Sequence, residues 1–193
     1  MSDEHPEKWL NYLAITTVVM AVFATLATYN GGKYSTKAVI AQNQSSDQWS
    51  YYQAKSIKGY NYELQCDKLE LDLLSMPPDC AAKVQDSFRK KIDSYKAKIA
   101  KYEEEKSTIQ KEAKALEELR NKCQCHSKYF GFGIIFLQIS ILLCAVAGFT
   151  KNKYLWYGSI ALGIIGIYFF ALGFYAKPLP LPSLPIPLPG MKQ

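Results

Sequence analysis

The stretch "WLNYLAITTVVMAVFATLAT", residues 9–28, contains no charged side chain. An α-helix of about 20 residues crosses the hydrocarbon core of a bilayer and satisfies its own backbone hydrogen bonds there. Two more uncharged runs of similar length follow at residues 129–149 and 154–175. The three runs predict transmembrane helices at these positions, with the lipid bilayer as a partner.

The tail that precedes the first run, "MSDEHPEK" at residues 1–8, is mostly acidic. A secretory signal peptide begins with a basic region. The first run is therefore expected to stay in the membrane as an anchor.

Residues 29–128 form the polar part of the chain, with 18 of its 23 basic and 14 of its 17 acidic residues. Both signs are mixed along the whole region, which is typical of solvated helix faces. No basic patch or nucleic-acid motif accompanies them, so no nucleic-acid partner is expected.

The sequence "SMPPD", residues 75–79, divides this polar region into two arms of similar length. Two adjacent prolines cannot lie inside a helix, so the chain is expected to turn at residues 76–79. The predicted fold is all-α, with a long, coiled-coil-like helical hairpin (29–128) between the first and second spans. Gly31 and Gly32 are the expected joint between the first span and its arm.

Apolar residues recur in both arms at alternating steps of three and four, the pattern of a heptad seam. The second arm gives Phe88, Ile92, Tyr95, Ile99, Tyr102, Lys106, Ile109, Ala113, Leu116, Arg120 and Cys123. The first gives Ile57, Tyr60, Leu64, Asp67, Leu71 and Leu74.

The start of the first arm, "AQNQSSDQWSYYQAKSIK" at residues 41–58, is rich in amides and aromatic rings. Small residues on one helical face permit close helix approach. Two interpretations stay open: packing on the other arm of the same chain, or a subunit interface or hydrated lumen. The candidate residues are Ala41, Gln42, Asn43, Ser45, Gln48, Trp49 and Tyr52.

The spans contain no charge, so no ion path is indicated. Polar groups inside spans either bond to a neighbouring helix or line a pore. The candidates for intramembrane packing are Gln138, Ser159, Gly163 and Gly166.

The proline-rich tail, residues 177–193, alternates proline with aliphatic residues. Such a sequence is extended and close to polyproline II. An exposed apolar strip favours docking, on the chain's own oligomer, on lipid or on a protein partner. The hairpin tip is a second candidate surface for a protein partner. The candidate docking residues of the tail are Pro178, Leu179, Pro182, Pro185 and Leu188.

No catalytic motif of the common hydrolase, nucleotide-binding or metalloprotease kinds is present, and no enzyme activity is predicted. The five cysteines suggest no disulfide framework. The run "CQCH", residues 123–126, lacks the spacing of zinc and haem sites, so no metal or cofactor is predicted.

The ordered motifs "QN", "DQW" and "YYQAKSIK" at residues 42–43, 47–49 and 51–58 resemble a family of three-span bacterial inner-membrane proteins, the domain of unknown function 4337. The resemblance implies a bacterial inner membrane and supplies no activity. The layout alone also resembles the proton-driven motor subunits of biopolymer transport.

Positive charge near the spans favours an outside N-terminus with the hairpin and C-terminus in the cytoplasm. That orientation puts nine basic residues inside and leaves Lys8, Lys151 and Lys153 outside. The favoured function is a non-enzymatic, homo-oligomeric assembly with a helical stalk, a scaffold or a channel-like complex. The alternatives are a subunit of a heteromeric motor or transport complex and a membrane adaptor.

Overall fold

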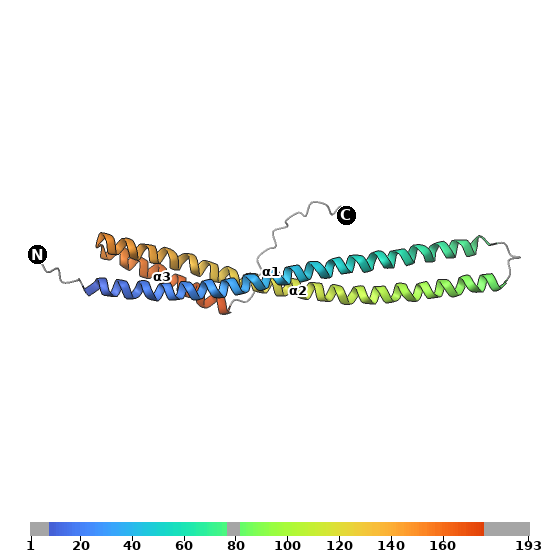
Figure 1. Ribbon diagram of the computed structural model, residues 1–193, viewed down its shortest axis with the longest axis horizontal. Helices are drawn as coiled ribbons and strands as arrows, with labels where there is room; N and C mark the ends of the chain where they lie inside the picture. The colour runs from blue at the N-terminus through green and yellow to red at the C-terminus, as the bar shows by residue number, and fades with distance from the viewer. Residues whose placement is uncertain (1–7, 77–81, 176–193) are drawn as a thin grey trace, which may run out of the picture. The chain divides into compact units, whose positions relative to one another are not determined.

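The computed structural model describes residues 8–76 and 82–175, which form three α-helices (Figure 1). Helix α1 spans Lys8–Leu74, α2 spans Ala82–Thr150 and α3 spans Lys153–Tyr175. No strand occurs in the described ranges, and the expectation of an all-helical chain is confirmed for them.

All three helices are long and apolar enough to cross a membrane, as the uncharged runs predict. Aliphatic side chains in the apolar part of α1 point outward: Ile15, Val18 and Val22 are 53–63% exposed. Because lipid tails are as apolar as these side chains, such a surface suits a bilayer.

Helix α1 runs without a break through Gly31 and Gly32, so the expectation of a joint there is wrong. A glycine inside a helix costs only about 1 kcal/mol relative to alanine, which packing can offset. A Cβ atom on buried Gly31 would lie 3.2 Å from the Cβ of Phe130. The absent side chain lets α2 pack closely here.

The connection between α2 and α3 is a two-residue turn. Lys151 adopts a left-handed conformation with φ of 52°. The N–H of Asn152 donates to the carbonyl of Ala147 at 3.2 Å, closing α2 in the manner of a Schellman motif. The Asn152 side-chain oxygen accepts from the N–H of Tyr154 at 2.9 Å and caps α3.

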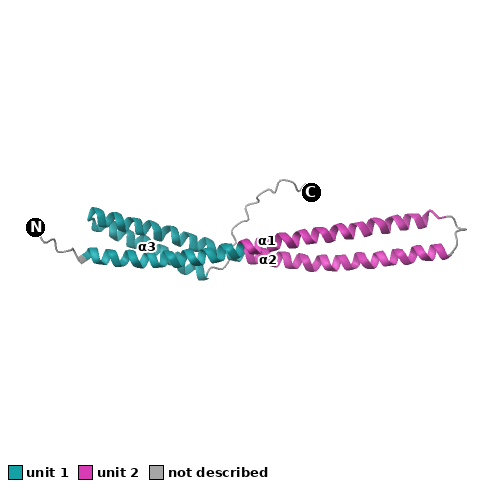
Figure 2. Cartoon of the chain, viewed as in Figure 1, with its two compact units in different colours: residues 1–38, 121–193 teal, residues 39–120 magenta. Residues whose placement is uncertain are grey.

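The chain forms two compact units, shown in Figure 2. Unit 1 comprises residues 1–38 and 121–193, and unit 2 comprises residues 39–120. The core of unit 1 consists of Met20, Ala24, Leu137 and Cys144, flanked by Phe23, Ile141, Trp156, Ile160 and Ile167.

In unit 2, α1 and α2 pack against each other, and the two predicted seams have opposite outcomes. Every seam position predicted on α2 is buried or half-buried. Every seam position predicted on α1 is exposed: Ile57, Tyr60, Leu64, Asp67, Leu71 and Leu74.

The α1 seam is wrong because α1 turns a different face, with small residues, toward α2. Gly59 and Cys66 are buried, and a Cβ atom on Gly59 would lie 3.8 Å from the Cβ of Tyr102. The small residues at these two positions leave room for the tyrosines of α2, since bulky side chains at every facing position would overfill the space.

Candidate functional site

The first part of α1 in unit 2, from Ala41 to Tyr52, is closely packed on α2. Ala41 is 1% exposed and Ser45 is 1% exposed. The Ser45 hydroxyl donates to the carbonyl of Ala113, a residue with no exposed surface, at 3.3 Å. These small side chains allow the close approach that the sequence predicted for this face.

The aromatic residues of this stretch lie at the edge of the same contact. Trp49 donates its indole N–H to a Glu117 carboxylate oxygen at 2.9 Å. Its ring meets Tyr52 edge-on with centroids 5.6 Å apart. Both side chains are half-buried. Through Glu117 and Lys106 of α2, respectively, they extend the contact beyond the small residues.

The amides of the stretch are distributed over several environments. Gln42 accepts a hydrogen bond from Arg120, Gln48 is half-buried and Asn43 is exposed. Within the chain, the face therefore packs on α2 while Asn43 points away from it. A subunit interface or lumen formed by these residues remains a prediction.

Lys106 is the buried cation of the α2 seam, with 8% exposure. Its ammonium group lies 2.6 Å from a Glu103 carboxylate oxygen and within 5.7 Å of the ring centroids of Tyr52 and Tyr60. The hydrogen bond to Glu103 raises the pKa of Lys106 despite its burial. A charge is tolerated in the seam because an acid and two rings surround it.

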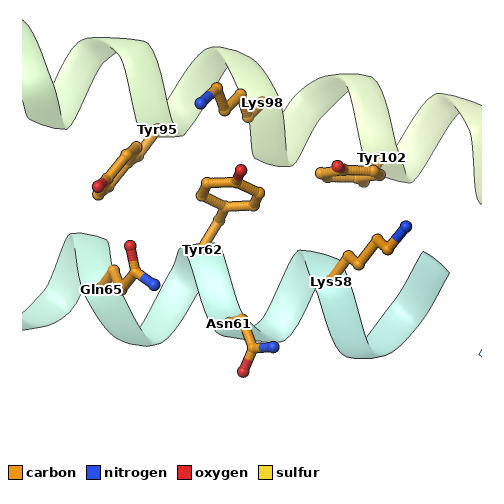
Figure 3. Close-up of a pocket in the computed structure, with 7 residues that line it drawn as sticks. All are labelled: Lys58, Asn61, Tyr62, Gln65, Tyr95, Lys98 and Tyr102. Carbon is orange, nitrogen blue, oxygen red and sulfur yellow. The ribbon is translucent and has the colours of Figure 1, made fainter. Parts of the chain in front are cut away.

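An open groove of about 560 Å³ lies between the two helices of unit 2 (Figure 3). Tyr62 of α1 lies between Tyr95 and Tyr102 of α2, at ring-centroid distances of 5.4 and 5.8 Å. The ammonium of Lys98 is 4.9 Å from the Tyr62 ring centroid. Sequence reasoning missed Tyr62, because the predicted α1 seam was displaced toward Tyr60 and Leu64.

A charge pair joins the helices beside this groove. The Lys55 ammonium lies 2.6 Å from a Glu105 carboxylate oxygen. This hydrogen bond lowers the pKa of Glu105 and raises the pKa of Lys55. The pair fixes one α1 register against α2.

In unit 1, the predicted packing residues of α3 meet α2 and α1. Ser159 has no exposed surface, and its carbonyl accepts from the Ser140 hydroxyl at 2.6 Å. Gly163 and Gly166 are buried. A Cβ atom on Gly166 would lie 2.7 Å from the Cγ of Leu137. These residues are packing positions between helices of the same chain.

Gln138, the fourth predicted packing residue, lies elsewhere. Its side chain is on the exposed surface of α2, beside Ile135, Ile139 and Leu142. Among the residues that the structure describes, none forms a hydrogen bond with its amide. Packing of Gln138 against another subunit remains a prediction.

The cysteine–histidine run is placed in unit 1. His126 contacts the carbonyl of Gly173 at 2.8 Å and stacks on Tyr34 with centroids 4.8 Å apart. Cys123 is buried and Cys125 half-buried. In residues 8–76 and 82–175, no group of three or more His, Cys, Asp and Glu side chains is arranged to hold a metal ion.

Three segments with predicted roles lie outside the described residues: the acidic tail 1–7, residues 77–79 of the predicted turn, and the proline-rich tail 177–193. The candidates Pro178, Leu179, Pro182, Pro185 and Leu188 belong to that tail.

The geometry defines a class of protein: an α-helical chain whose three helices each contain a stretch suited to a membrane. Residues 9–176 match the family described as "Domain of unknown function (DUF4337)", and the chain belongs to this family. No curated protein and no solved structure matches the chain.

Proposed function

We propose that this protein is a non-enzymatic, multi-pass membrane protein that assembles with copies of itself into a scaffold. Unit 1 is the membrane part. The charged helices of unit 2 form a hairpin that projects from the membrane as a stalk. The proposal places it in a bacterial inner membrane, which the family resemblance implies. The lysine count around the spans favours a stalk in the cytoplasm.

The observation that supports self-assembly best is the exposed amide of Gln138. It lies near the middle of the uncharged run at residues 129–149, on a surface otherwise made of aliphatic side chains. Hydrocarbon offers no hydrogen-bond partner to a primary amide, so an unpaired one is unfavourable there. The Gln138 side chains of two copies can satisfy each other, because each amide is both donor and acceptor.

The neighbours of Gln138 one heptad away suit such a contact. Gly131 and Ala145 are small, and a Cβ atom on Gly131 would meet no other atom within 4 Å. Small residues two turns before and after the amide leave room for a second membrane helix along this face. The pairing is expected to contribute about 1 kcal/mol per hydrogen bond.

The polar groups of the unit 1 core support a scaffold more than a channel. The Ser140 hydroxyl bonds to Ser159, and the Cys144 thiol lies 3.0 Å from the Ser159 hydroxyl. Trp156 donates its indole N–H to the Thr16 hydroxyl at 3.2 Å. Each of these groups bonds to another helix of the same chain. Its hydrogen-bonding capacity is therefore used in packing rather than left open to a passing solute.

The mass of the intact particle after gentle extraction, measured by native mass spectrometry, tests the proposal. A single multiple of the 21.8 kDa chain is expected. The variant Gln138→Leu is expected to shift the particle toward the single chain. The control Thr25→Val removes an exposed span hydroxyl that already bonds to its own helix, and should leave the mass unchanged. A wild-type protein that is monomeric in detergents and in lipid discs would refute the proposal.

A further inference from the structure

The outward face of α1 in unit 2 bears a stripe of large apolar side chains. Ile57, Tyr60, Leu64, Leu71 and Leu74 are 59–81% exposed. We call these five residues the α1 stripe. They occupy heptad a and d positions, with Asp67 at the one remaining d position between them. Exposed apolar residues that share one helical face mark an interaction surface.

The spacing of the α1 stripe specifies a helix as its partner. Side chains at alternating steps of three and four pack into a second helix as knobs into holes. Helix α2 packs on a neighbouring face of α1, through Gly59 and Cys66. It reaches only the edge of the stripe, where the ammonium of Lys106 lies 5.6 Å from the Tyr60 ring centroid.

A lipid surface is a poor match for the α1 stripe. Helices that lie on membranes are rich in basic residues on their polar side. The exposed charges that flank the stripe are balanced, with Lys58 and Lys68 against Asp67 and Asp72.

The flanking charges favour α1 of a second copy, aligned in parallel. In that arrangement, Glu63 at a g position meets Lys68 of the second copy at the following e position, and symmetry makes the pair twice. An antiparallel arrangement would bring g positions together. It would place Glu63 near Glu70, which already pairs with Lys96 of α2 at 2.8 Å, and would form no pair between Glu63 and Lys68. Copies held in one membrane with one topology also project their stalks in parallel.

We propose that the α1 stripe is the contact between stalks, made by two α1 helices in parallel and in register. The inference rests on the self-assembly proposed above. It adds the surface through which two copies meet and the parallel direction of their α1 helices. Asp67 lies within this contact beside Lys68 of the second copy. A polar residue at one core position fixes register at a cost in stability.

The short length of the α1 stripe fits a contact between anchored chains. Residues 57–74 span less than three heptads, which is marginal for free helices in water. Two chains joined in the membrane meet at a high effective concentration, which makes a weak contact sufficient.

A photo-crosslinking amino acid placed at Leu64 of the full-length protein, in membranes, tests the contact. The expected product is a dimer crosslinked to α1 of the second copy. The control position is Ala97, exposed on α2, where no dimer is expected. A crosslink from Leu64 to residues 176–193, to lipid or to a foreign protein would overturn the inference, as would a dimer only from Ala97.

Charge exchange tests the parallel arrangement. Lys68→Glu should weaken the Leu64 crosslink several-fold, because Glu63 would then face a glutamate. Adding Glu63→Lys should restore it, since the pairs re-form with exchanged signs. Asp67→Leu should strengthen the crosslink by completing the apolar core. No rescue by the double variant, or a weaker crosslink with Asp67→Leu, would overturn the parallel contact.

These tests separate the two proposals. An oligomeric particle whose Leu64 does not crosslink would leave the assembly standing and remove the stripe contact. A monomeric particle would remove both.

Discussion

The packing of α3 on α2 predicts that the substitution Gly166→Ala destabilises the protein. The added Cβ would lie 2.7 Å from the Leu137 Cγ and 3.1 Å from the Leu137 backbone nitrogen. Leu137 has no exposed surface, so it has no free space to move into. Overpacking of this kind costs about 1–3 kcal/mol.

Gly158→Ala on the same helix is the matched control, because its Cβ would meet nothing within 4 Å. Both variants gain the same helix propensity, about 1 kcal/mol, so this gain cancels in the comparison. Gly166→Ala should therefore be less stable than Gly158→Ala by about 1–3 kcal/mol. Unfolding by dodecyl sulfate in micelles, followed by circular dichroism, measures the difference.

Gly163→Ala refines the test. Its Cβ would crowd the thioether end of Met20, the far end of a flexible side chain, and would lie 3.2 Å from the Ser140 hydroxyl oxygen. Because that end can move and the Leu137 backbone cannot, Gly163→Ala should be less destabilising than Gly166→Ala. Equal unfolding midpoints for the Gly158 and Gly166 variants would refute the close packing of Gly166 on Leu137.

Three further predictions concern unit 2. Gly59→Ala should stabilise the protein by up to about 1 kcal/mol in thermal unfolding, since its Cβ makes ordinary contact with the facing tyrosine; a loss of stability would contradict this packing. Trp49→Phe removes the indole bond to Glu117 and should cost about 1–2 kcal/mol in the same assay, with no effect arguing against that bond. Lys55 lowers the pKa of Glu105, so the stabilising contribution of this carboxylate is present above the ordinary pKa of glutamate and is lost as pH falls through the lowered value. Acid unfolding should therefore depend less steeply on pH in Glu105→Gln, and an unchanged profile would show that the pair does not contribute.

Periodicity predicted one helix of the unit 2 pair better than the other. On α2, large apolar residues define a single seam that ends in small ones, such as Ala113 and Cys123, and the structure buries both. On α1, two adjacent heptad patterns compete, and the more hydrophobic one, with Leu64 and Leu71, is exposed. Hydrophobicity alone cannot tell which of the two patterns faces α2, because that depends on how α1 fits against the tyrosines of α2.

For the glycines and polar residues of the spans, the sequence likewise predicts some packing positions but not which helix each one faces. The sequence predicted α3 as a packing surface, and the structure buries Ser159, Gly163 and Gly166. It assigned Gly31 to a joint, because local propensity does not reveal that Phe130 packs there. Gln138 could be identified as polar within an apolar run, but the direction it faces depends on how the three helices meet.

Each of the two surfaces proposed for self-assembly is unfavourable when it is exposed to its surroundings, lipid for one and water for the other. Gln138 is an amide on a surface suited to lipid, where a hydrogen bond has no other source. Leu64 and Leu71 are aliphatic side chains in a charged region that is too polar for the bilayer, where water surrounds them. The proposed arrangement, with a second copy in the same orientation, would correct both without a foreign partner. Because amide pairing and apolar burial respond to different substitutions, loss of Leu64 crosslinking in Gln138→Leu would show that contacts within the membrane hold the stalks together.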